Sequence, residues 1–137
     1  MTARWTCPKC DREFERARQG HTCIPGITVD QVFAERPDWQ REIYDRIIDF
    51  LHTLGPVHED AVNIGVFLKR IGKIGEVRPK TKWVELIIAL PRRIADPRFV
   101  RSYPRGEGAW YVVKVFAPDD VDDQVEAWLE ESYEDAG

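Results

Sequence analysis

The feature that most constrains this chain is a group of metal-ligating residues within its first 23 positions. All three cysteines of the sequence and one of its histidines follow the spacing C-x2-C-x10-H-x-C. Three thiolates and one imidazole are a complete tetrahedral ligand set for a structural zinc ion. The sequence therefore predicts one structural Zn²⁺ per chain, bound by Cys7, Cys10, His21 and Cys23.

The local sequence predicts how these ligands are presented. Cys7-Pro8-Lys9-Cys10 has the form of a knuckle, and Asp11, which follows it, tolerates a left-handed backbone. Phe14 is expected to pack against the metal site. His21 and Cys23 are two residues apart and cannot share a helix face, so they are expected in a turn or an extended stretch. Without a recognition helix between the ligand pairs, a structural staple is favoured over direct nucleic-acid contact.

Length and composition predict one folded domain beside this segment. A chain of 137 residues that is 43% hydrophobic can bury one core, so we expect a zinc-binding segment at 1–26 and a single domain at 27–137. Clustered cysteines in odd number fit a reducing compartment. The first 18 residues do not resemble a signal peptide, and no apolar run approaches the roughly 20 residues of a membrane span. A cytoplasmic protein with no membrane partner is expected.

Helical patterns stand at both ends of the domain. Thr28 and Gln31 form a capping box that predicts a short helix to about residue 35. Apolar residues recur at helical spacing over 38–54, and Gly55 is expected to end that helix with a left-handed cap. Asp119 and Asp120 are expected to cap a last helix, whose buried stripe comprises Val121, Val125, Trp128, Leu129 and Tyr133.

The middle of the chain has strand patterns. Residues 62–68 alternate as one strand, and a second short strand ends near residue 78. Residues 83–90 and 109–117 are almost continuously apolar, which predicts central strands covered on both faces. Residues 91–108 are expected to form a long loop. The fold class is therefore α+β, with a four-stranded antiparallel meander flanked by helices.

Charge is segregated along the chain in a way that the net value of −4 conceals. Residues 69–105 contain 11 basic and 3 acidic side chains, whereas residues 106–137 contain 1 basic and 10 acidic. One interpretation is a zinc-stabilised module that contacts DNA or RNA through a basic surface. The other is that the acidic C-terminal helix neutralises this stretch. The basic residues in question are Lys69, Arg70, Arg78, Lys80, Lys82, Arg92 and Arg93.

Two other classes of function stay open. Trp83, Trp110 and Tyr111 predict an aromatic face for a protein partner or a small ligand. The third hypothesis is an enzyme, although the sequence contains no recognised catalytic motif. Its active site would be formed around Glu85, which lies in an apolar strand. Pairing with a cation of a neighbouring strand, such as Lys114, is the simpler explanation of that carboxylate.

Several short motifs occur together in this chain. They are Trp5-Thr6-Cys7-Pro8-Lys9-Cys10 with His21-Thr22-Cys23, Thr28-Val29-Asp30, Val77-Arg78-Pro79-Lys80, Asp120-Val121-Asp122, Trp128-Leu129 and Tyr133. In these motifs the chain resembles the bacterial domain-of-unknown-function family 5655, with the zinc segment as an N-terminal extension. The resemblance implies an α+β domain in a bacterial cytoplasm and supplies no catalytic residues.

Overall fold

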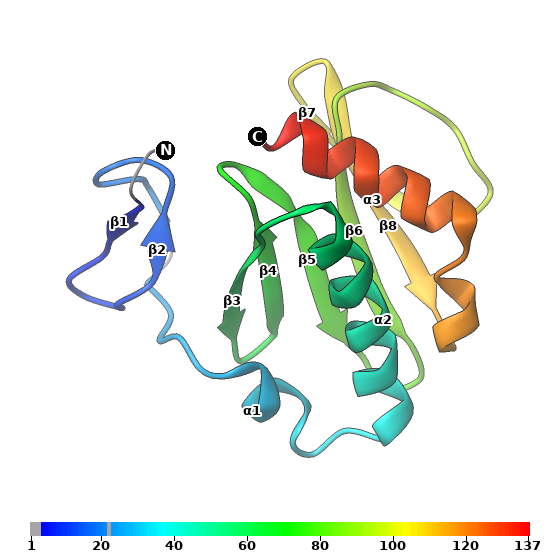
Figure 1. Ribbon diagram of the computed structural model, residues 1–137, viewed down its shortest axis with the longest axis horizontal. Coiled ribbons are helices and arrows are strands. Elements are labelled where there is room, and N and C mark those ends of the chain that lie inside the picture. Colours follow the sequence, from blue (N-terminus) through cyan, green and yellow to red (C-terminus); the bar gives the residue numbers. More distant parts are fainter. Residues whose placement is uncertain (1–3, 22) are drawn as a thin grey trace.

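The computed structural model describes residues 4–21 and 23–137, and within these ranges α-helices pack on a six-stranded antiparallel sheet (Figure 1). The strand order is β3-β4-β5-β6-β8-β7. The helices α2 and α3 lie on the same face of this sheet. The strands are β3 (His58–Val62), β4 (Gly65–Lys69), β5 (Lys73–Pro79), β6 (Val84–Leu90), β7 (Phe99–Arg105) and β8 (Gly108–Val115).

A small lobe precedes the sheet, and Figure 1 shows it beside β3. It contains the hairpin of β1 (Trp5–Thr6) and β2 (Glu13–Phe14), which pair antiparallel. We call residues 4–21 and 23–26 the knob and the rest of the described chain the body. The knob has its own small apolar cluster, in which Cys7, Cys10 and Phe14 are buried and Trp5 is partly buried.

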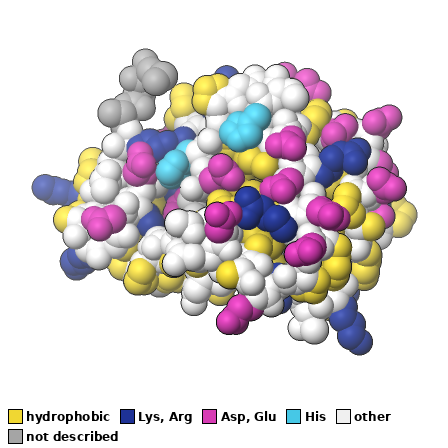
Figure 2. All heavy atoms as spheres, turned by 60° about the horizontal axis from the view of Figure 1, so that its bottom comes forward, with side chains coloured by type: hydrophobic (Ala, Val, Ile, Leu, Met, Phe, Trp, Pro, Cys, Tyr) yellow, Lys and Arg dark blue, Asp and Glu magenta, His cyan; other side chains and the backbone are white. Residues whose placement is uncertain are grey.

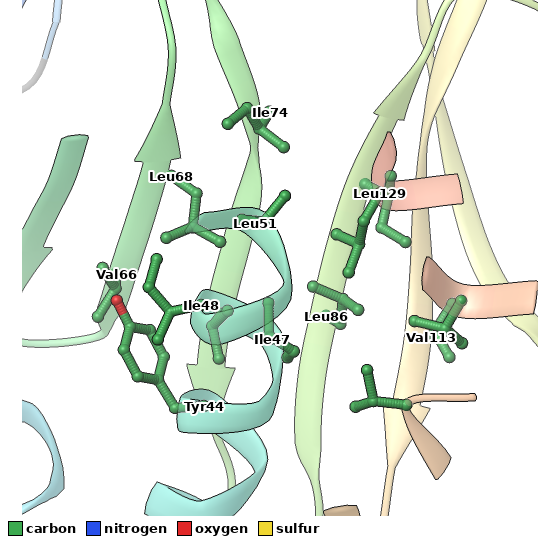
Figure 3. Packing of buried hydrophobic residues seen from close by; sticks show 14 of the residues in the cluster. Tyr44, Ile47, Ile48, Leu51, Val66, Leu68, Ile74, Leu86, Val113 and Leu129 are labelled. Carbon is green, nitrogen blue, oxygen red and sulfur yellow. The ribbon is translucent and has the colours of Figure 1, made fainter. Parts of the chain in front are cut away.

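The main core lies between the sheet and the helix α2 (Asp38–Leu54), whose bounds agree with the predicted 38–54. Apolar side chains spaced three and four apart put one stripe of this helix on the sheet. Figure 3 shows Ile47, Ile48 and Leu51 pointing towards Leu68 and Leu86. Gly55 ends the helix with a φ of +150° and an extended ψ of −163°, so the expected left-handed cap is wrong.

The two other helices agree with the predicted caps in different degrees. At α1 (Val29–Phe33) the capping box is present: Gln31 N–H donates to Thr28 Oγ1 at 3.1 Å, and Thr28 N–H donates to Gln31 Oε1 at 2.8 Å. At α3 (Asp123–Asp135) the cap is Asp122, which accepts from Val125 N–H. The predicted cap was wrong because Asp119 and Asp120 lie in a preceding 3₁₀ turn (Pro118–Asp120).

The stripe predicted for the last helix is buried, and its members pack with α2 and the sheet. The rings of Trp128 and Phe99 pack in a tilted arrangement with their centroids 4.7 Å apart. Among the described helices, we find none with the length and apolar character that a membrane crossing requires.

The sheet has two strands more than the predicted meander of four. Residues 62–68 are not one strand, because Asn63 and Ile64 make a tight turn between β3 and β4, whose register pairs Val62 with Gly65. The predicted loop 91–108 contains the edge strand β7, which pairs with β8. The α+β class is correct, and the strand number was wrong.

The two faces of the sheet differ in their cover. The residues Val84, Leu86, Ile88 and Leu90 of β6 point to the helices and are fully buried. The alternate residues of the same strand point to the opposite face, which carries none of the described helices. On that face Val112 is also fully buried, because long side chains from neighbouring strands lie over it. The predicted central position of β6 and β8 is confirmed, and most of their residues are buried on both faces, with helices over one face and long side chains over the other.

Candidate functional site

The four predicted ligands meet in the knob. Their ligand atoms, three Sγ and one nitrogen of His21, all lie within 4.8 Å of one another. The Sγ atoms of Cys7 and Cys23 are 3.9 Å apart. His21 Nε2 lies 3.5 Å from Cys10 Sγ and 3.4 Å from Cys23 Sγ.

The three individual separations match edges of a metal-centred tetrahedron. With bonds of about 2.3 Å to sulfur and about 2.0 Å to nitrogen, such a site separates two sulfurs by about 3.8 Å and a sulfur from a nitrogen by about 3.5 Å. The observed values agree with both edges. The Cys/His cluster can therefore hold a metal ion.

Local backbone geometry explains how the first two cysteines are presented. Asp11 has a φ of +59°, as predicted, and its N–H donates to the Cys7 carbonyl at 2.8 Å. The Cys7 N–H donates in turn to the Arg12 carbonyl at 2.9 Å. The knuckle is thus closed by its own backbone.

Outer contacts fix the orientation of the histidine. His21 Nδ1 lies 2.6 Å from the Gln19 carbonyl, so that Nδ1–H donates there and Nε2 is left to bind the metal. The imidazole stacks on Phe14 at a centroid distance of 3.9 Å, as expected for this aromatic. Trp5 meets the other edge of the ring at 6.1 Å.

The electrostatic surroundings favour a thiolate at Cys7. Burial alone would raise the pKa of this thiol, but hydrogen bonds from the N–H groups of Lys9 and Cys10 outweigh that effect and lower the pKa to about 6. The same backbone donors would stabilise a metal-bound sulfur.

A buried charge cluster joins the knob to the body. Arg12 Nε and Nη2 donate to Asp60 at 3.0 and 3.1 Å, and Lys69 Nζ donates to the same carboxylate at 2.7 Å. Lys69 Nζ also donates to the Glu13 carbonyl and lies over the Phe14 ring. These three charged side chains are at most 8% exposed. We call Arg12, Asp60 and Lys69 the docking triad, which sequence reasoning missed.

The seven predicted nucleic-acid contacts do not form one patch. Lys69 is buried in the docking triad. Arg70, Arg92 and Arg93 lie at the end of the sheet where β4 and β6 finish, whereas Lys80 and Lys82 lie in the turn at the other end. Since the seven residues of β6 separate these ends, the two groups are roughly 20 Å apart.

Several cations of the basic stretch 69–105 are paired with acidic side chains. Arg92 pairs with Glu131 at 2.8 Å, and Arg98 pairs with Asp122 at 2.9 Å, so acids of the C-terminal segment neutralise part of the basic stretch. Arg93 instead donates to the Gly108 carbonyl at 2.7 Å. Figure 2 likewise shows basic and acidic side chains intermingled on the face that it draws.

A different set of basic residues does share one surface. We call the helix-free side of β5, β6, β8 and β7 the open face. It forms a shallow hollow of about 340 Å³. The hollow is lined by Lys73, Glu76, Arg78, Glu85, Ile87, Arg101, Tyr103, Trp110 and Val112.

Aromatic rings and cations alternate on the open face. Lys73 Nζ lies 5.7 Å from the centroid of Trp110. Lys114, beside the hollow, lies 4.1 Å from the centroid of Trp83. Tyr103 is opposite Trp110 in the β7–β8 register and is 50% exposed. The sequence predicted Trp83 and Trp110 as contact residues, and both are partly exposed here.

The third predicted aromatic contact, Tyr111, lies on the other face. It is 3% exposed and stacks on Phe99 at 4.3 Å. Its hydroxyl accepts from the Ile94 N–H at 2.8 Å. Tyr111 is therefore a core residue, because the strand alternation that exposes Trp110 turns its neighbour towards the helices.

Glu85, the candidate catalytic carboxylate, is 4% exposed and has its own partners. It accepts from Arg101 Nη2 at 2.8 Å and from Trp83 Nε1 at 3.3 Å. Lys114, which the sequence suggested as its partner, stands opposite in the register but lies over Trp83. Glu85 thus belongs to a satisfied polar network.

Comparisons with known proteins add one finding. No curated protein and no solved structure matches the chain significantly. A family profile matches residues 29–136, which cover every helix and the whole main sheet but none of the four metal ligands. The chain therefore belongs to the family described as Domain of unknown function (DUF5655).

Proposed function

We propose that this protein is a zinc-stabilised module of the bacterial cytoplasm that binds single-stranded DNA or RNA across its open face. The observation that carries the proposal is the alternation of cations and aromatic rings on a sheet face without helices. The knob supplies the metal site, and the open face supplies the contacts.

Zinc is the metal that the donor set favours. Three thiolates and one imidazole in a closed tetrahedron suit a structural zinc site, and no position is left for a substrate. Ligands of this kind require reduced cysteines, which supports a reducing compartment such as the cytoplasm. Native mass spectrometry of the purified protein should find one zinc ion per chain. A preparation that folds fully with another metal or with none would contradict this assignment.

Charge and shape favour nucleic acid over other ligands at the open face. Lys73, Arg78, Arg101 and Lys114 face two carboxylates, Glu76 and Glu85, so this surface is positive although the whole chain is negative. Within the described ranges, no ion pair engages Lys73 or Lys114. Basic side chains contact phosphates, and aromatic rings stack on unpaired bases, which is how sheet surfaces bind single strands.

Removing two open-face charges should weaken this binding in a measurable way. In Lys73→Gln/Lys114→Gln, two phosphate contacts are lost, so the slope of log K against log salt should become shallower by about 1.4 on single strands. Fluorescence anisotropy with mixed-sequence single-stranded DNA and RNA between low and high salt measures this slope.

The matched control removes two positive charges elsewhere. Arg16 and Arg46 are exposed, in the knob and in α2 respectively, so Arg16→Gln/Arg46→Gln changes the net charge equally but should leave the slope unchanged. The proposal fails if wild-type protein does not bind either strand at low salt. It also fails if the control lowers the slope as much as the open-face variant does.

A protein partner is the second candidate function, and one observation favours it. Phe116 is 57% exposed and lies 6.3 Å from Trp83, which makes an apolar corner beside the open face. The substitution Phe116→Ala should release a partner bound there, and the affinity of the wild-type protein for that partner should be the same in low and high salt. Nucleic-acid binding with a steep salt slope would instead favour the first function.

A further inference from the structure

A second cavity lies where the knob meets the body. Its volume is about 490 Å³, which is within the range of small-molecule sites. The knob contributes Arg4 and Glu15, and the body contributes the rest of the lining. The body residues are Pro56, Val57, His58, Arg70 and Ile71. This cavity shares no residue with the open face.

The lining combines apolar walls with cationic groups. Pro56, Val57 and Ile71 offer aliphatic surface, and Ile71 is 45% exposed although it is a large apolar side chain. Two guanidinium groups stand against one carboxylate. A cavity of this kind suits a ligand with an apolar body and a negatively charged end.

Arg4 supplies the observation that points to an anion. Its Nη1 is buried and has no hydrogen-bond partner among the described residues. A buried donor of a charged group without an acceptor destabilises the folded protein, and a hydrogen bond to a bound ligand would remove that penalty. Guanidinium groups match the oxygens of a carboxylate or a phosphate in geometry as well as in charge.

The two other polar groups of the lining fit this reading. Arg70 donates from Nη1 to the Tyr133 carbonyl at 3.1 Å and lies over the Tyr133 ring, so its guanidinium is held at the cavity wall. The pKa of His58 lies below its ordinary value because of burial and the nearby charge of Arg4. A neutral imidazole can still donate one N–H to an anion.

We propose that this cavity binds a small organic anion, a carboxylate or phosphate monoester with an apolar body, through Arg4 and Arg70. The knob would then complete a binding site as well as pack on the sheet. Neither the metal ligands nor the proposed nucleic-acid surface contacts such a ligand directly.

Isothermal titration of the zinc-loaded full chain with four probes tests the proposal. Phenyl phosphate and benzoate carry both an anionic group and an apolar body, whereas inorganic phosphate lacks the body and benzyl alcohol lacks the charge. Binding of either organic anion, at least tenfold tighter than binding of both comparison probes, is the expected result. Phenyl phosphate alone would assign a phosphate ligand, and benzoate alone a carboxylate ligand. Failure of both to bind at millimolar concentration would overturn the proposal.

Substitutions then identify the residues. Arg4→Gln should weaken anion binding by at least about tenfold, because a charge-assisted contact is lost. Arg16→Gln removes the same charge from an exposed position of the knob and should not change the affinity. Zinc content and circular dichroism must be unchanged in both variants. Equal affinities in wild type and Arg4→Gln would refute the assignment. Nucleic-acid binding is proposed for another surface, so its success or failure is measured independently of this result.

Discussion

Asp60→Asn should lower the free energy of unfolding by about 3–5 kcal/mol, because it leaves two buried cations without their counter-charge. The carboxylate accepts from Arg12 and Lys69 at a site that is 5% exposed. Asparagine keeps the shape but supplies no negative charge. Urea denaturation followed by far-UV circular dichroism measures the change.

A control and a compensating variant distinguish charge from shape. Glu130→Gln neutralises an exposed carboxylate of α3 and should change stability by no more than about 0.5 kcal/mol. Lys69→Met removes one cation, so the double variant Asp60→Asn/Lys69→Met should be more stable than the sum of the two single changes predicts. Strict additivity would show that the docking triad does not act as a unit.

The effect should also depend on pH. Burial opposes ionisation of Asp60, but the hydrogen bonds from Arg12 and Lys69 outweigh it and hold the pKa of the carboxyl below its usual value. A carboxyl whose pKa is lowered by folding stabilises the folded state. This contribution is complete at pH values above the unfolded pKa of about 3.9, and it is lost as the pH falls through the folded pKa. The stability difference between wild type and Asp60→Asn should therefore be largest near neutrality and shrink below about pH 4.

The docking triad also shows what the sequence cannot reveal. Arg12 and Asp60 are 48 residues apart, and charged residues in such positions are usually solvated. Nothing in the local pattern predicts that both are buried. The Cys/His cluster of the knob was predictable for the opposite reason, since its chemistry and spacing are local.

The missed strands have physical explanations of the same kind. The alternation of residue types over 62–68 continues through the turn at Asn63 and Ile64, so the sequence pattern does not show that the chain reverses direction there. The edge strand β7 contains Pro104 and exposes most of its side chains, which gives it the composition of a loop. By contrast, the apolar residues of α2 recur at regular helical spacing because one side of the helix packs on the core. The bounds of α2 could therefore be predicted from that periodicity.

The open face was missed because its cations are distant in sequence. Lys73 and Lys114 come from β5 and β8, and only the strand order brings them to one surface. The basic stretch 69–105 instead suggested a patch of neighbours, and strand alternation sends those neighbours to both faces and both ends of the sheet. A count of charge along the chain therefore does not show on which surface of the folded protein that charge lies.

Removal of the metal should unfold the knob and leave the body folded. Among the described residues of the knob, the buried apolar side chains are Cys7, Cys10 and Phe14, which is far too little apolar surface to stabilise it alone. The body, by contrast, has a continuous core of its own. Metal binding supplies the folding free energy of such small lobes, with apparent values of about 10–16 kcal/mol in zinc-finger peptides. Hydrogen exchange after chelation should show fast exchange at the Cys7 and Asp11 amides, whose hydrogen bonds close the knuckle.

The substitution Cys10→Ser should have the same effect without a chelator, because serine does not replace a thiolate ligand to zinc. Thr6→Ser, a change of similar size at an exposed neighbouring position, should retain both the metal and the slow exchange. Slow exchange at Ile88, which is fully buried in the body, should persist in both variants. Loss of protection throughout the body would show instead that the metal holds the whole chain together. Protection of the knuckle amides without metal would show that the docking triad alone is enough to fold the knob.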